Sequence, residues 1–132
     1  MWFFVLERLF VVLERFSDLK NLDLIGHDIG ESMDEFSNFS AFSCLANLET
    51  FILSDCNITN DAMEYLVYFS SLKKLDLSEN KIGNLGNWSL RDITGYLIYE
   101  IYFPNLETFI LENNYIYESG VALLSSIKFL NF

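Results

Sequence analysis

Hydrophobic residues recur in this chain at fixed positions of an eleven-residue pattern that is present four times. In each copy an aliphatic or aromatic residue occupies positions one, four, six and eleven, and most other positions are polar. The copies span residues 19–29, 48–58, 72–82 and 106–116. Because side chains two residues apart in a strand point to the same side, positions four and six predict a short strand with one buried face. The inward pairs are Leu22 and Leu24, Phe51 and Leu53, Leu75 and Leu77, and Phe109 and Leu111.

Between the copies the spacing of apolar residues changes to that of helices. After the second copy, Asp61 is a candidate helix cap with Glu64 three residues later, and an apolar stripe follows. After the fourth copy, Ser119 is a candidate cap. The stripe behind it comprises Val121, Leu123, Leu124, Ile127 and Leu130. The amphipathic segment 1–18 predicts an N-terminal helix, and residues 83–103 form an insertion that glycines interrupt.

The third copy, from Leu72 to Ile82, best fits the pattern L-x-x-L-x-L-x-x-N/C-x-L, and the other copies replace some leucines by Phe or Ile. This pattern resembles the leucine-rich repeat family, in a divergent form similar to ribonuclease-inhibitor-like and cysteine-containing repeats. The resemblance implies an α/β fold, a right-handed curved solenoid of about four to five repeats, with a parallel sheet on its concave face. It covers nearly the whole chain, so we expect residues 1–132 to form a single domain with repeats that start near residues 19, 48, 72 and 106.

Position nine of each copy follows the strand, where the chain must turn. A side chain inside such a turn can bond buried backbone groups, and an asparagine amide suits this role. The predicted structural turn ladder consists of His27, Cys56, Asn80 and Asn114. In the family that the pattern resembles, cysteine is the usual alternative to asparagine here. His27 departs from the pattern, and we interpret it as a structural histidine because no metal-ligating or catalytic partners surround it.

The variable positions of the strands supply the side chains that the resemblance places on the concave face. Position two alternates in sign along the copies, and since parallel strands lie about 4.8 Å apart, it predicts a ladder of weak ion pairs that starts at Lys20. The predicted partner-binding residues are Asp23, Ile25, Glu49, Ile52, Asp55, Lys73, Asp76, Glu79, Glu107, Ile110 and Glu112. This mildly acidic surface with isoleucines favours a protein partner with basic and apolar residues, although single exposed isoleucines are also common on ordinary surfaces.

Composition and charge narrow the function further. Eight basic residues stand against 19 acidic ones, a net charge of −11, which argues against direct binding of nucleic acid and against docking on an anionic membrane. No phosphate-binding glycine loop, nucleophile elbow or zinc-ligand set is present, so we expect no cofactor, no metal and no enzymatic activity. An enzyme that uses His27 is the remote alternative.

Targeting signals are weak. The apolar start lacks a basic opening and a small-residue cleavage site, and no apolar run is long enough to span a membrane. Cys44 and Cys56 are too few for a disulfide scaffold. The sequence therefore favours a reducing, intracellular setting, with the cytoplasm first and the nucleus as the alternative.

Two functions follow from these observations. The first is a non-catalytic interaction module or scaffold that binds a protein through its concave sheet or an exposed end. The alternative is a structural accessory subunit of a large assembly, such as a ribosome or another ribonucleoprotein. An aromatic content of 17% and the apolar end of the chain favour the alternative, because four repeats hide little apolar surface.

Overall fold

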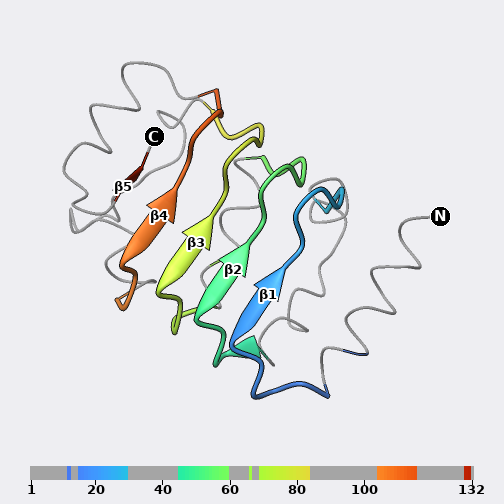
Figure 1. Cartoon of the computed structure of the whole chain (residues 1–132), viewed down its shortest axis with the longest axis vertical. Coiled ribbons are helices and arrows are strands. Elements are labelled where there is room, and N and C mark those ends of the chain that lie inside the picture. The colour runs from blue at the N-terminus through green and yellow to red at the C-terminus, as the bar shows by residue number, and fades with distance from the viewer. Residues whose placement is uncertain are drawn as a thin grey trace, which may run out of the picture.

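The computed structural model describes residues 12, 15–29, 45–59, 66, 69–83, 104–115 and 130–131. Within these residues, five short strands form one sheet in which every neighbouring pair is parallel. The strands are β1 (Asn21–Asp23), β2 (Thr50–Ile52), β3 (Lys74–Asp76), β4 (Thr108–Ile110) and β5 (Leu130–Asn131). They lie side by side in chain order, as Figure 1 shows. The predicted parallel sheet is therefore confirmed.

The register of the sheet follows the sequence repeat without a shift. Leu22 pairs with Phe51, Phe51 with Leu75, and Leu75 with Phe109, so position four of each repeat forms a continuous row. A slip of one residue would turn every apolar side chain to the opposite face, so burial of this row fixes the register.

The core lies on the side of the sheet to which positions four and six point. The side chains of Phe51, Leu53 and Leu75 are fully buried there. Leu77 and Leu111 are buried at position six as well. Positions one and eleven add further buried aliphatic residues: Ile29, Leu48, Ile58, Leu72, Ile82 and Leu106. Phe69 packs edge-to-face on Phe51 with ring centroids 4.9 Å apart. Each such residue contributes about 1.5–3 kcal/mol relative to an exposed side chain.

Strand β1 is the edge of the sheet within the described part of the chain. Its Leu22 is only half-buried, whereas the equivalent Phe51 and Leu75 are fully buried. The difference follows from position, because a central strand is covered by neighbours on both sides and an edge strand on one side only.

Strand β5 lies where the sequence predicts the end of a helix. The helical stripe predicted to run to Leu130 is wrong at its end, because Leu130 pairs with Phe109, and Asn131 with Ile110, in a parallel ladder. The backbone of β4 would otherwise expose an unpaired row of polar groups, and β5 satisfies part of it. The other predicted helices, including 1–18 and the insertion 83–103, fall largely outside the described residues.

The turn after each strand contains a residue in the left-handed region. Position eight has a positive φ in all four repeats: 76° at Gly26, 53° at Asp55, 57° at Glu79 and 56° at Asn113. Glycine, asparagine and aspartate adopt this left-handed conformation at lower cost than other residues, and glutamate adopts it at higher cost. The turn thus reverses the chain at the same point in every repeat, which places the side chains beyond the strands in equivalent positions.

Candidate functional site

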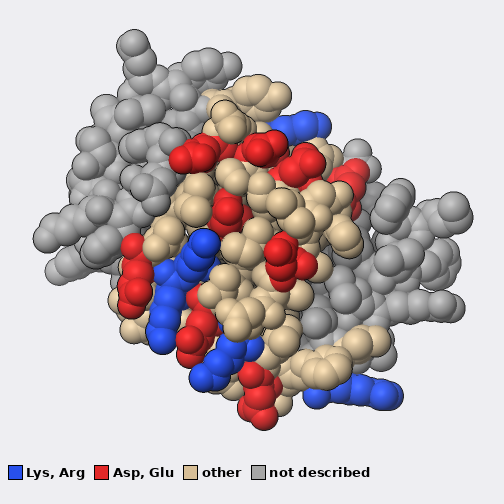
Figure 2. Space-filling model, in the orientation of Figure 1, with Lys and Arg blue, Asp and Glu red and all other residues tan. Residues whose placement is uncertain are grey.

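The sheet has a second face, opposite the core, that we call the open face. It consists of the side chains at positions two, three and five of the four repeats, together with the exposed turn residues at positions seven and eight. These residues are Lys20, Asn21, Asp23, Ile25, Glu49, Thr50, Ile52, Asp55, Lys73, Lys74, Asp76, Glu79, Glu107, Thr108, Ile110, Glu112 and Asn113. Figure 2 looks onto this face and shows charged side chains gathered at both ends of the strands.

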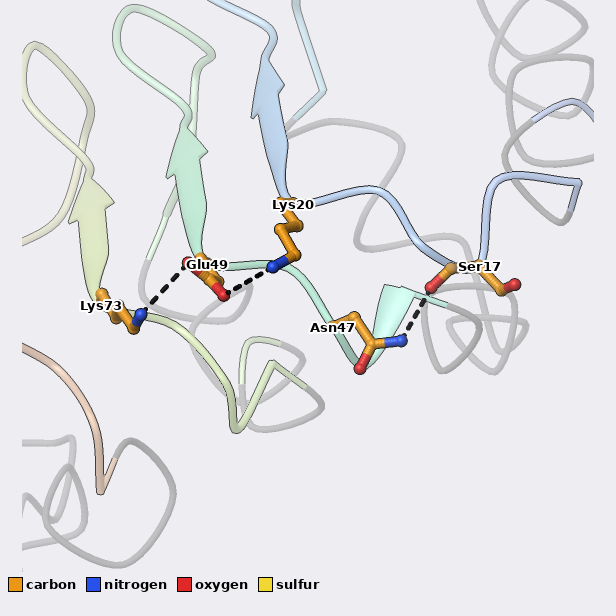
Figure 3. Close-up of polar contacts among 5 residues, drawn as sticks. All are labelled: Ser17, Lys20, Asn47, Glu49 and Lys73. Atoms are coloured by element: carbon orange, nitrogen blue, oxygen red, sulfur yellow. Dashed lines mark hydrogen bonds and ion pairs between the residues drawn. The ribbon is translucent and has the colours of Figure 1, made fainter.

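At the strand starts, position two forms a row of alternating charge. Glu49 lies between two lysines, with Oε1 3.5 Å from Lys20 Nζ and Oε2 3.2 Å from Lys73 Nζ (Figure 3). The hydrogen bond from Lys73 and the positive charge of Lys20 lower the pKa of the Glu49 carboxyl. Glu107 follows in the same row, but its side chain makes no ion pair with the described residues. Both lysine side chains are more than half exposed, so these ion pairs contribute little to stability. Their main effect is to orient the Glu49 side chain between the two lysines.

Two asparagines just before the strands anchor the loops that lead into the sheet. Asn47 Nδ2 donates to the Ser17 carbonyl oxygen at 3.0 Å (Figure 3), and Asn105 Nδ2 donates to the Ser70 carbonyl oxygen at 3.4 Å. Asn47 directly precedes position one of the second repeat, and Asn105 directly precedes position one of the fourth. These bonds fix the places at which the chain enters β2 and β4.

At the strand ends, position five alternates between aspartate and isoleucine. Asp23 pairs in register with Ile52, and Asp76 with both Ile52 and Ile110. Each carboxylate is oriented by the turn behind it: Asp23 Oδ1 accepts the Ile25 N–H at 3.0 Å, and Asp76 Oδ1 accepts the Ser78 N–H at 2.9 Å. The two isoleucines are half-buried, so part of each apolar side chain meets solvent.

The turns beyond the strand ends are acidic. Asp55, Glu79 and Glu112 are exposed at positions seven and eight. A shallow hollow lies there, lined by Gly26, Asp28, Asp55, Asn57, Glu79 and Lys81. Of the ten charged residues of the open face, the strand starts carry three basic and two acidic ones, and the strand ends and turns carry five acidic ones. The open face is therefore polarised along the strands, which Figure 2 shows as mixed colours at one end and mainly red at the other.

Beneath the turns, position nine binds the backbone of two repeats at once. Asn80 is 5% exposed; its Oδ1 accepts the N–H groups of Cys56 at 3.0 Å and Ile58 at 2.9 Å. Its Nδ2 donates to the carbonyl oxygens of Leu53 at 2.8 Å and Leu77 at 2.9 Å. One amide thus satisfies buried backbone groups of the second and third repeats.

Asn114 and Cys56 occupy the same position in their own repeats. Asn114 Nδ2 donates to the Leu77 carbonyl oxygen at 2.9 Å, and its Oδ1 accepts the Ile82 N–H at 3.0 Å. The Cys56 thiol donates to the Leu24 carbonyl oxygen at 3.0 Å. Burial raises the pKa of this thiol to about 11, so it remains protonated. In each case the side chain reaches back to the preceding repeat.

Known protein families bear directly on this arrangement. The family model of the leucine-rich repeat matches residues 44–67 and 70–86, which contain the second and third repeats. Over these two segments the chain is similar to leucine-rich repeats. A search of the curated proteins finds no match. Leucine-rich repeats generally mediate contacts between proteins and are generally non-catalytic, and the parallel sheet with its Asn and Cys turns fits that architecture.

His27 differs from the other residues at position nine. Its side chain is exposed and makes no hydrogen bond to another described residue, although its backbone N–H donates to the Leu24 carbonyl oxygen at 3.1 Å. The reason lies in the direction of the ladder. Position nine binds the turn of the preceding repeat, and within the described sheet nothing precedes β1. The imidazole therefore lacks the buried backbone groups that Asn80 finds.

Among the described residues, the structure shows no candidate metal centre. No group of three or more His, Cys, Asp or Glu side chains is placed to hold a metal ion there. None of the described helical segments has the length and apolar character that crossing a bilayer requires.

The structure brings the predicted partner-binding residues together on one side of the sheet, where their role stays a prediction. Ile25 is 58% exposed beside the end of β1. The predicted set left out Asn21, Thr50 and Thr108, which occupy position three of their repeats and lie on the same face. Alternation along a strand is the signal that identifies them, because positions three and five flank the buried position four.

Proposed function

We propose that this protein is a non-catalytic interaction module that binds a protein partner through the open face. The observation that supports this most is the row at position five, in which half-exposed isoleucines alternate with oriented carboxylates. Interfaces between proteins combine apolar contact with complementary charge, and this row offers both on a rigid sheet. The expected partner carries basic and apolar residues.

The polarity of the open face strengthens the proposal. Its acidic side chains are concentrated at the strand ends, while Glu49 at the strand starts is already paired with Lys20 and Lys73. The carboxylates at the strand ends form no ion pair with another described residue. Such charges attract a partner of opposite sign and raise its rate of association. The acidic end is thus the part of the face best suited to meet a basic surface.

The proposal can be tested by affinity capture from the native source with the full chain. We expect Ile52→Thr/Ile110→Thr to lose the specifically captured protein, because threonine keeps the preference for strands but removes apolar contact area. Val12→Thr is the matched control, since Val12 is 50% exposed and lies outside the sheet. Circular dichroism checks that each variant folds. A captured protein that binds the double variant as well as the wild type would overturn the proposal.

A second candidate function is a permanent subunit of a large assembly, such as a ribosome or another ribonucleoprotein. It is favoured by large apolar side chains that are more than half exposed: Phe16, Ile25 and Tyr115. Isolated exposed residues are common on monomers, so this observation supports the second candidate less strongly than the position-five row supports the first.

A further inference from the structure

We infer that the occupant of the open face is a basic amphipathic α-helix of the partner, which crosses the strands over their carboxyl ends. In this helix, Lys or Arg and apolar residues alternate at intervals of one helical turn. The inference rests on the proposed function, because it names the kind of segment that fills the face.

The alternation at position five sets the spacing that the partner must match. Asp23, Ile52, Asp76 and Ile110 are neighbours in register on β1 to β4. Neighbouring strands lie about 4.8 Å apart, so the two aspartates are separated by about 9.6 Å, and the two isoleucines likewise. A partner segment that crosses the strands must present a side chain about every 4.8 Å, and these side chains must be basic and apolar in turn.

An α-helix meets this requirement. Its pitch is about 5.4 Å, so residues i, i+4, i+7 and i+11 lie on one side at about one-turn intervals. When the helix is inclined by roughly 27° to the perpendicular of the strands, its pitch projects onto a spacing of about 4.8 Å. Basic residues at i and i+7 then face Asp23 and Asp76, and apolar residues at i+4 and i+11 face Ile52 and Ile110.

An extended peptide fits the same row poorly. Its side chains on one face repeat every two residues, or about 6.6–6.8 Å, so it must be inclined by roughly 45° to match the strands. At that angle it moves along the strands as far as it moves across them, and it leaves position five within a few strands. The helix also suits the breadth of the row, because a helix is about 10 Å wide and covers positions five and eight together.

Charge decides where along the strands the helix lies. Lys20, Lys73 and Lys74 at the strand starts repel a basic helix, and Asp55 and Glu79 beyond the strand ends attract one. The Asp23 and Asp76 carboxylates are held in place by the N–H groups of Ile25 and Ser78, so little side-chain freedom is lost when a cation binds them. The preferred position is therefore over position five, displaced toward the turns.

The inference is tested by fluorescence anisotropy with the full chain and synthetic peptides of about 18 residues, which span about 27 Å as helices. One peptide carries Lys at i and i+7 and Leu at i+4 and i+11. The other has the same composition in an order that spreads Lys around the helix. We expect the first to bind at least about tenfold more tightly, because only its side chains match the row.

A pair of variants then locates the peptide on the sheet. Asp23→Asn/Asp76→Asn removes two charges but keeps the oxygen that accepts each turn N–H, and we expect it to weaken the first peptide about tenfold. Asp18→Asn removes a charge outside the open face and should change its affinity by less than about twofold.

Each outcome bears on one claim. Equal affinity for the two peptides, or unchanged binding by Asp23→Asn/Asp76→Asn, overturns the helical occupant, as does tighter binding of a peptide with Lys and Leu at every second residue. If the captured partner still depends on Ile52 and Ile110 in that case, the proposed function stands without the helix. If capture does not depend on the isoleucines, the proposed function fails whatever the peptides do.

Discussion

At the scale of single residues, the buried amide of Asn80 connects two repeats. It accepts two backbone N–H groups and donates to carbonyl oxygens on both sides of the boundary between the second and third repeats. No apolar side chain of similar volume can replace these bonds, and water has no access to a site with 5% exposure. The repeats are thus joined by polar contacts as well as by the apolar core.

Removal of this amide should therefore be costly. We expect Asn80→Ala to lower the free energy of unfolding by about 3 kcal/mol or more, because it leaves the N–H groups of Cys56 and Ile58 buried without an acceptor. Asn114→Ala should cost less, since Asn114 is half-buried and accepts the N–H of Ile82. Urea unfolding followed by circular dichroism measures both, and equal losses would contradict the argument.

The thiol of Cys56 should be inert in the folded protein. Burial raises its pKa to about 11, so at pH 8 the reactive thiolate is a very small fraction, and the side chain is fully enclosed. We expect iodoacetamide to modify Cys56 slowly in the native state and rapidly in urea, as followed by peptide mass spectrometry. Equally rapid modification in both states would show that the thiol is accessible.

Residue types at position nine were predictable from the sequence, but their partners were not. Asn80 and Asn114 stand where the eleven-residue pattern puts a turn amide. His27 stands there as well, yet it is exposed, because the bonds of position nine run to the preceding strand and β1 is the edge of the described sheet. A single repeat does not reveal its place in the array.

At the scale of elements, the left-handed turn after each strand has one residue that fits it poorly. Glu79 has φ 57° where the other repeats carry glycine, aspartate or asparagine. We expect Glu79→Asn to raise the free energy of unfolding by about 0.5–1 kcal/mol, because asparagine tolerates this conformation at lower cost. Glu79→Ala removes the same charge without this advantage and should not stabilise. Thermal unfolding distinguishes the two, and equal stability of both variants would refute the explanation.

The charged row at the strand starts should make stability depend on pH through Glu49. Lys73 and Lys20 hold its pKa below the ordinary value of 4.5, so the folded state favours the ionised carboxyl. A lowered folded-state pKa contributes stability above the unfolded-state value, and this contribution is lost as the pH falls through the folded-state value. We expect Glu49→Gln to be less stable than the wild type at pH 7 and equally stable at acid pH.

Glu107→Gln is the matched control for this prediction. Glu107 occupies the same position of its repeat, without an ion pair to the described residues. Chemical unfolding across the pH range should therefore show little pH-dependent difference between this variant and the wild type. A difference as large as that of Glu49→Gln would mean that position in the row, and not the lysine contacts, controls the effect.

The sequence predicted the strands β1 to β4 because their apolar residues alternate within a repeat that recurs four times. It missed β5, because Leu130 continues the spacing of the preceding helical stripe and so supports either structure. A comparison of residues 127–132 with residues 106–111 contains the missing signal, since apolar residues again occupy positions one, four and six.

At the scale of the whole molecule, the salt dependence of partner binding distinguishes the two candidate functions. A reversible contact steered by the acidic strand ends should weaken strongly between about 0.05 M and 0.5 M salt, because the Debye length shortens severalfold over this range. A permanent apolar contact should survive and co-sediment with the assembly. Gradient sedimentation of the native complex at both concentrations measures this, and survival in high salt would favour the second candidate function.

The candidate face was predictable as a set of positions, but its polarity along the strands required the structure. Sequence columns give the charge at each position, while the register shows that positively charged lysines share one end of the sheet and five carboxylates the other. The identity of the partner does not follow from the repeat, because the same scaffold supports many different contacts.

The alternation of the open face restricts how an array of this kind can be lengthened or shortened. Repeats with Lys and Asp alternate with repeats that carry Glu and Ile at the same positions. Excision of the second repeat alone would set Lys20 beside Lys73 and Asp23 beside Asp76, whereas excision of two successive repeats restores every neighbour. Repeats should therefore be removed from or added to this chain two at a time. A repeat grafted from another array must also continue the alternation at positions two and five.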